Sequence, residues 1–234
     1  MKRCITMLAI ISLLSLTGWA QEASQPKHLI EAKKLLKQVD LSNTSYKHGT
    51  SEIVWQGICS LHADCSGFID GLLAHTYGYD EAAFKKWLGS RRPTAARYHD
   101  AIVAGNGFTE VTSVGKVWPG DIIAVKYLHR KDNTGHVMLV AEQPRRMAAK
   151  KPLVEGTEQW EVTVIDSSQT GHGTTDTRHH KGKDGKDHDG LGQGVLRLYT
   201  DKQGHVAGFS WSTVGASKFI EPIEEHVAIG RLAK

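Results

Sequence analysis

The seven residues HADCSGF, from His62 to Phe68, mark the start of the main helix of this chain. Asp64 is the expected N-cap residue, because an Asp carboxylate can accept hydrogen bonds from the first free backbone N–H groups of a helix. Gly78 then supplies a C-terminal stop. The sequence therefore predicts a helix over 64–78 whose apolar face is formed by Phe68, Ile69, Leu72, Leu73 and Thr76.

Two further helices are predicted on either side of this one. Ser24 and Pro26 open a segment with apolar residues at helical spacing, which should end near Asp40. A short helix is expected over 80–88, where Gly89 stops it. Between Gly89 and Gly107 the pattern is mixed and predicts no element.

After Trp118-Pro119-Gly120 the apolar period changes from helical to alternating, which indicates strands. Strands are predicted over 122–127 and 136–142, and a third carries Trp160, Val162, Val164 and Asp166 on one face. Residues 194–200 and 205–211 flank a polar turn and form a hairpin. Helices followed by strands predict an α+β domain, with N-terminal helices packed on a mostly antiparallel sheet.

The first 20 residues are typical of a secretory signal, with cleavage expected after Ala20. Their apolar run, 5–16, is shorter than the roughly 18 residues that a membrane span needs, so stable membrane insertion is not expected. Cleavage would leave 27 basic and 25 acidic residues. That balance, without a basic stripe interleaved with aromatics, does not favour a nucleic-acid partner. The sequence thus predicts a periplasmic or secreted protein.

Cys65 falls in the first turn of the predicted helix, where free N–H groups and the helix dipole stabilise a thiolate. A thiolate nucleophile needs a base, and His136 opens a strand after Gly135. If the 160–166 strand pairs antiparallel with that strand, Asp166 lies beside His136 and can orient its ring. These three side chains are the candidate catalytic residues.

Four short motifs support this interpretation: Tyr46-x-x-Gly49, Asp64-Cys65-Ser66-Gly67-Phe68, Gly120-Asp121-Ile122 and Gly135-His136-Val137. In order and approximate spacing they resemble the NlpC/P60 cysteine peptidases, papain-like enzymes typical of bacterial cell walls. The resemblance runs from about Tyr46 to Ser168. It implies an NlpC/P60 catalytic domain over 46–234, preceded by a helix and linker over 21–45.

The resemblance also implies roles for individual residues. Cys65 would attack an amide carbonyl, His136 would act as base and then acid, and Asp166 would orient His136. Tyr46 would back the thiolate or help to hold the oxyanion, together with the backbone N–H of Cys65. We assign Asp64 and Ser66, which flank the nucleophile, to substrate binding.

The expected reaction is hydrolysis of an amide bond in peptidoglycan stem peptides, by analogy the bond between D-glutamate and a diamino acid. No cofactor or metal is expected, and the protein should be a monomer. One alternative is an N-acetylmuramoyl-L-alanine amidase, or an acyl or peptidyl transferase, with the same dyad. Another is a non-catalytic wall-binding module locked by a Cys59–Cys65 disulfide.

The sequence departs from the family pattern at three places. The third catalytic position, occupied here by Asp166, is more often His, Asn or Gln in the family. A Gly- and His-rich loop over 169–193 is longer than the pattern expects, and the C-terminal hairpin is extra. The spacing of the polar side chains in the loop matches neither a zinc nor an EF-hand pattern, so a flexible, solvated loop is expected there. Those side chains are His172, His179, His180, His188, Asp184, Asp187 and Asp189.

Overall fold

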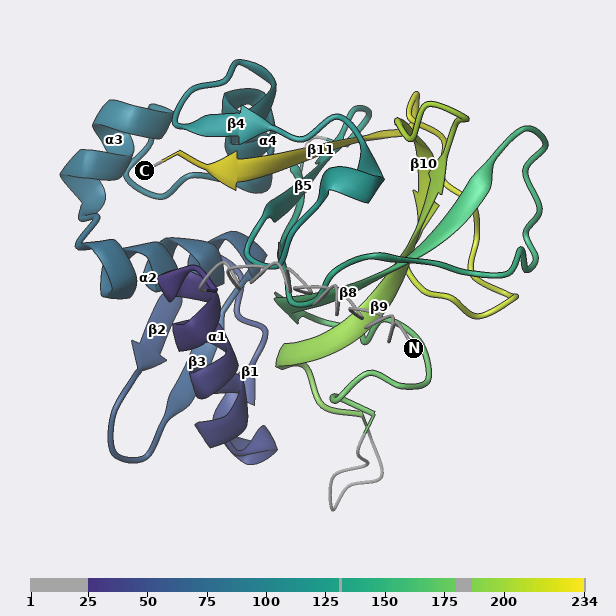
Figure 1. Ribbon diagram of the computed structural model, residues 1–234. Coiled ribbons are helices and arrows are strands. Elements are labelled where there is room, and N and C mark those ends of the chain that lie inside the picture. The colour runs from purple at the N-terminus through teal and green to yellow at the C-terminus, as the bar shows by residue number, and fades with distance from the viewer. Residues whose placement is uncertain (1–24, 131, 180–186, 234) are drawn as a thin grey trace, which may run out of the picture.

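The computed structural model describes residues 25–130, 132–179 and 187–233 (Figure 1). These residues form four α-helices: α1 (Lys27–Gln38), α2 (Cys65–Tyr77), α3 (Glu81–Leu88) and α4 (Ala95–Val103). Two 3-10 turns are present, η1 (Leu41–Asn43) and η2 (Val114–Lys116). The strands are β1 (Thr44–Ser45), β2 (Ser51–Val54), β3 (Ser60–Ala63), β4 (Phe108–Glu110), β5 (Ile122–Tyr127), β6 (Gly135–Val140), β7 (Arg145–Arg146), β8 (Glu158–Ser168), β9 (Gly190–Thr200), β10 (Val206–Ser210) and β11 (Glu225–Leu232).

A large antiparallel sheet has the strand order β10-β9-β8-β6-β5-β11-β4, with β7 paired to β8. A small second sheet has the order β1-β3-β2, and its β1–β3 pair is parallel. The predicted class, α+β with a mostly antiparallel sheet, is confirmed. The predicted order of helices before strands holds for the large sheet, whose strands all follow α4, but the short strands β1 to β3 precede α2.

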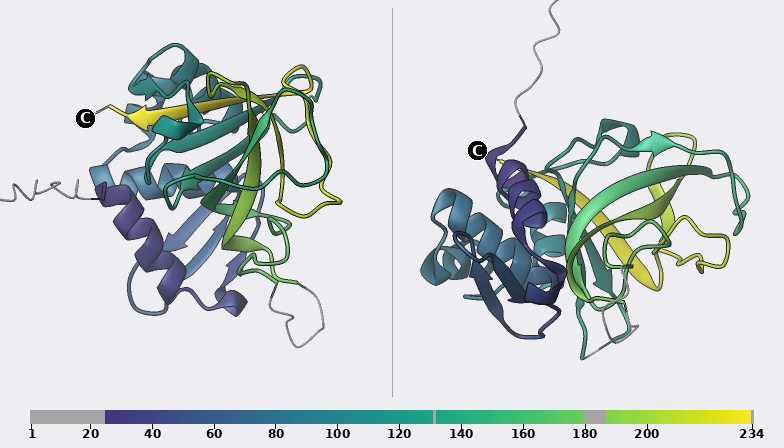
Figure 2. Two further views of the ribbon diagram at one scale, coloured as in Figure 1. Left: turned by 45° about the vertical axis from the view of Figure 1, so that its right-hand side comes forward. Right: turned by 90° about the horizontal axis from the view of Figure 1, so that it is seen from below.

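The helices lie together on one side of the large sheet (Figures 1 and 2), where α2 and α4 pack on its central strands. Apolar side chains cover both faces of this sheet, because alternate residues of each strand point to opposite sides. One core joins the sheet to α1, α2 and α4, and the second lies on the opposite face. Residues of the second core include Ile123, Val125, Met138, Val140, Val162, Val164, Leu196 and Leu198.

The predicted helix over 64–78 is confirmed together with both of its caps. The Asp64 carboxylate accepts a hydrogen bond from the Gly67 N–H, and Gly78 adopts the left-handed conformation that ends the helix. The predicted helices near 24–40 and over 80–88 are also confirmed, as α1 and α3. Helix α4 lies in the segment for which the sequence predicted no element.

The predicted β-hairpin is present as β9 and β10, but β9 begins at Gly190 and is longer than expected. It pairs with β8 along its whole length, from Ser168 opposite Gly190 to Glu158 opposite Thr200. The connection between β8 and β9 is therefore shorter than the predicted 169–193 loop. The predicted signal segment, 1–20, lies outside the described residues.

Candidate active site

Cys65 is the first residue of α2, and β3 leads directly into it. Asp64 Oδ1 accepts hydrogen bonds from the Gly67 N–H (2.7 Å) and the Ser66 hydroxyl (3.0 Å). Its other oxygen accepts one from the Gly49 N–H (2.8 Å). Asp64 is thus occupied in holding the helix start against the preceding loop, although it also lines the cavity beside Cys65.

Tyr46 is brought to the same place by the parallel pairing of β1 with β3, in which Ser45 lies opposite His62. Tyr46, the residue after the end of β1, therefore lies beside the junction of β3 and α2. Burial raises the pKa of Tyr46, and the negative charges of Cys65, Asp64 and Asp166 raise it further. Its hydroxyl consequently keeps its proton and can donate a hydrogen bond next to the sulfur.

His136 lies near the start of β6 and is 8% exposed. The preceding Gly135 has a φ of 145°, and a Cβ there would lie 1.9 Å from the Val125 carbonyl oxygen. Only glycine fits this close approach of β6 to β5. The Gly-His pair of the motif is therefore required by backbone packing as well as by chemistry.

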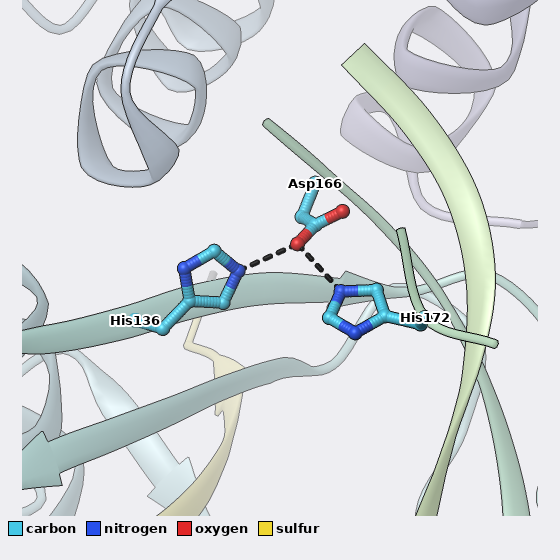
Figure 3. Close-up of side chains that lie close together, drawn as sticks. All are labelled: His136, Asp166 and His172. Atoms are coloured by element: carbon cyan, nitrogen blue, oxygen red, sulfur yellow. Dashed lines mark hydrogen bonds and ion pairs between the residues drawn. The ribbon is translucent and has the colours of Figure 1, made fainter. Parts of the chain in front are cut away.

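The side chains of Cys65, His136 and Asp166 lie together. The Cys65 sulfur is close enough to the His136 ring to raise its pKa, and His136 Nε2 donates to Asp166 Oδ2 at 2.5 Å. Figure 3 shows the contact between His136 and Asp166. Burial alone would lower the pKa of His136, but the charge of Cys65 and the Asp166 hydrogen bond outweigh it and raise the pKa to about 10. The site therefore favours an imidazolium beside the sulfur.

Asp166 is fully buried and has three cationic or donor partners. Besides His136, His172 Nε2 donates to its Oδ2 at 2.8 Å (Figure 3), and Arg178 Nη1 lies 2.9 Å from its Oδ1 in an ion pair. The alignment of that ion pair falls short of a hydrogen bond. Burial favours the neutral acid, but the charges of Arg178 and His172 and the two histidine hydrogen bonds hold the pKa of Asp166 well below its usual range.

A hydrogen bond from a side chain of β8 holds the strand of Asp166 against the start of α2. The Ser167 hydroxyl donates to the carbonyl of Ala63, the residue before Asp64, at 2.6 Å. The placement of Asp166 beside His136 depended on antiparallel pairing of β6 with β8, and this pairing is present, with Leu139 opposite Ile165. The three candidate catalytic residues are therefore brought together from α2, β6 and β8.

Two hollows border this group, and Tyr46 and Asn133 line both. One, of about 290 Å³, is lined by Cys65, Ser66 and Asp70, among others. The other, of about 200 Å³, is lined by residues that include His136, His172, Tyr127 and Trp211.

Among the described residues, His136, Asp166 and His172 could hold a metal ion, since one ligand atom from each lies within 4.8 Å of the others. Hydrogen bonds already join these atoms in pairs, and the Arg178 ion pair places a positive charge on the same carboxylate. A metal ion would have to displace both of these hydrogen bonds. These three side chains therefore fit a hydrogen-bonded histidine–carboxylate group better than a metal centre.

Two sequence-based interpretations need correction. Cys59 and Cys65 are both free thiols. They lie at opposite ends of the extended β3, which separates them well beyond the roughly 7 Å that a disulfide spans. The 169–193 segment is not simply a solvated loop, because His172, Asp176 and Arg178 are buried. His180 and Asp184 of that segment lie outside the described residues.

No described helix has both the length and the apolar character needed to cross a membrane.

Comparison with known proteins gives one informative relative. No family model matches the chain, and no solved structure matches it. The uncharacterized protein R653 of Acanthamoeba polyphaga mimivirus is 34% identical over 227 residues, an alignment that covers 90% of this chain and 98% of the relative. Because the similarity spans nearly the whole of both proteins, the chain belongs to the same family as this mimivirus protein.

Proposed function

We propose that this protein is a papain-like cysteine hydrolase of the NlpC/P60 type that cleaves an amide bond in peptidoglycan stem peptides. The observation that carries the proposal is the group formed by Cys65, His136 and Asp166. Its sulfur lies at a helix N-terminus and interacts with the His136 ring, which in turn donates a hydrogen bond to Asp166. The motifs around Tyr46, Cys65 and His136 supply the substrate class by resemblance. Export to the periplasm or outside the cell is part of the same proposal.

In the proposed reaction, the Cys65 sulfur attacks the amide carbonyl, and a tetrahedral oxyanion forms. The N–H of Cys65, at the helix start, and the neutral Tyr46 hydroxyl are the available donors for that oxyanion. His136 gives its proton to the leaving amine, which breaks the C–N bond and leaves a thioester. His136 then takes a proton from water, which attacks the thioester and releases the acid and the Cys65 sulfur.

The test is digestion of purified peptidoglycan, with mass spectrometry of the released fragments. Wild-type protein should release stem-peptide fragments, Cys65→Ala should release none, and Cys59→Ala should behave as wild type. Cys59→Ala is the matched control because that thiol is equally buried but lies at the other end of β3. Equal digestion by Cys65→Ala and wild type would refute the proposal, and a cut between muramic acid and L-alanine would identify an amidase instead.

A further inference from the structure

His172 contacts a hydrogen-bond acceptor at each of its ring nitrogens. Nε2 lies 2.8 Å from Asp166 Oδ2, and Nδ1 lies 3.0 Å from the Trp211 carbonyl oxygen. A backbone carbonyl only accepts, and the Asp166 carboxylate is ionised because its pKa is held well below the usual range. Both ring nitrogens must therefore carry a proton to satisfy these contacts. His172 is 3% exposed, so water does not replace either partner.

The groups around His172 favour this charge. Asp166 faces it from β8, and Asp176 from its own segment accepts a hydrogen bond from the His172 backbone N–H at 2.7 Å. The opposing cations are His136 on β6 and Arg178. Arg178 divides its charge between Asp166 and a bidentate pair with Asp176, at 2.8 and 2.7 Å.

We propose that His172 is a positioning residue, with a proton on each ring nitrogen, that fixes the Asp166 carboxylate toward His136. Asp166 Oδ2 is shared by both histidines, while Arg178 contacts Oδ1. This arrangement prevents rotation of the carboxylate and draws part of its charge away from His136. The His136 proton is consequently less tightly held, which suits a group that must release it to a leaving amine.

The two segments that support Asp166 and His136 from this side lie C-terminal to the stretch, Tyr46 to Ser168, that resembles the cell-wall peptidases. His172, Asp176 and Arg178 belong to the connection between β8 and β9, and Trp211 follows β10. The Trp211 ring stacks on His172 at 5.8 Å and meets His136 edge-on at 5.4 Å. The C-terminal third of the chain therefore contributes directly to the site.

The charge state can be measured in the wild-type protein by ¹⁵N NMR of the histidine rings at pH 7. Both His172 nitrogens should show attached protons, and a single protonated nitrogen would overturn the proposal. This measurement needs neither a variant nor a substrate, so it remains decisive even if substitutions at His172 prevent folding.

The positioning role rests on the proposed function and is tested by variants. His172→Ala should slow alkylation of Cys65 by iodoacetamide about tenfold, equivalent to about one hydrogen bond to a charged group, because Asp166 no longer holds the His136 imidazolium beside the sulfur. His172→Gln retains a donor near Asp166 and should recover part of the rate. In this variant the ¹³C titration of the Asp166 carboxyl should move up by about one pH unit, the equivalent of one hydrogen bond to a charged group.

The matched control is His205→Gln, which removes an exposed histidine that pairs with Asp201 and should change neither readout. A folded His172→Ala with the wild-type alkylation rate, or an unmoved Asp166 titration in His172→Gln, would overturn the positioning role. Alkylation does not depend on the substrate. A protein that cleaves no wall peptide but shows these effects would refute the proposed function alone.

Discussion

Asp166→Asn changes the site by one atom and removes the charge that His136, His172 and Arg178 all contact. The lost bond to His136 is buried, charge-assisted and 2.5 Å long, and bonds of this kind contribute about 1.5–3 kcal/mol. At 1.36 kcal/mol per pKa unit, the pKa of His136 should fall by about one to two units from about 10. At pH 9 much of the imidazolium would therefore be lost, whereas at pH 7 most would remain.

The same change should also destabilise the fold, by about 3–5 kcal/mol at pH 7, because it leaves buried cations without their shared counter-charge. The pH dependence of this stabilisation follows from the shifted pKa values of His136 and Asp166. The raised pKa of His136 stabilises the fold below its unfolded value of 6.5, and this contribution is lost as the pH rises through about 10. The lowered pKa of Asp166 stabilises the fold above 3.8, and this contribution is lost as the pH falls through its folded value. Both contributions are present at pH 7.

The assay is an NMR titration of the His136 ring between pH 6 and 10.5, combined with urea unfolding at pH 7. Asp201→Asn is the control, because its pair with His205 is exposed and should contribute at most about 1 kcal/mol. An unchanged His136 midpoint in a folded Asp166→Asn protein would refute the assignment of Asp166 as the partner that sets the charge of His136.

Three further changes test separate parts of the site. Burial raises the pKa of Asp70 to about 8 despite a hydrogen bond from Tyr98. Because the folded protein then holds this proton more tightly than the unfolded chain, the free energy of unfolding of the wild type should fall as the pH rises from 3.8 to 8, by up to about 1.4 kcal/mol per pH unit. Asp70→Asn should remove that dependence, and a thermal-stability gap between the two proteins that stays constant with pH would contradict it. Gly135→Ala should destabilise the fold by more than about 1 kcal/mol in urea unfolding and slow Cys65 alkylation, because its Cβ meets the Val125 carbonyl. A wild-type free energy of unfolding and alkylation rate would count against the packing argument. Tyr46→Phe should lower kcat about tenfold with an unmoved pH profile, as expected for loss of one neutral hydrogen bond; a shifted profile would instead indicate a titrating tyrosine.

The parts of the fold that could be predicted from the sequence depend on local signals. Helix α2 was predictable because Asp64 caps it, Gly78 ends it, and its apolar residues recur at helical spacing. Strands β5, β6 and β8 were predictable because each is long enough to show alternation or a continuous apolar run. The juxtaposition of His136 with Asp166 then followed from antiparallel pairing alone.

Other elements lack such signals. Strands β1 to β3 have two to four residues each, which is too few to establish a period. Strand β11 buries Glu225 opposite Tyr127 of β5 and Gly230 between β5 and β4, so neither residue type nor alternation indicates a strand. Helix α4 presents a buried face of Tyr98, Ala101 and Ile102 that resembles a weak helical pattern, but buried His99 interrupts the apolar series.

The supporting group around Asp166 was missed for a related reason. His172 lies in a Gly- and His-rich segment whose composition is typical of a solvated loop. Its burial depends on Trp211, which lies 39 residues further along the chain and reaches the site only through the β9–β10 hairpin. The Asp176-x-Arg178 spacing was the available local signal, because those side chains can form an ion pair two residues apart.

The most direct test of the account compares the reactivity of the two thiols within one protein. After brief exposure to iodoacetamide at pH 6, mass spectrometry of the folded protein should find Cys65 alkylated and Cys59 largely unmodified, with substitution of His136 by alanine abolishing the preference. Both thiols are buried, at 6% and 4% exposed, so accessibility alone predicts similar rates. Equal modification of the two cysteines, or a preference that survives the loss of His136, would contradict a Cys65–His136 nucleophilic pair.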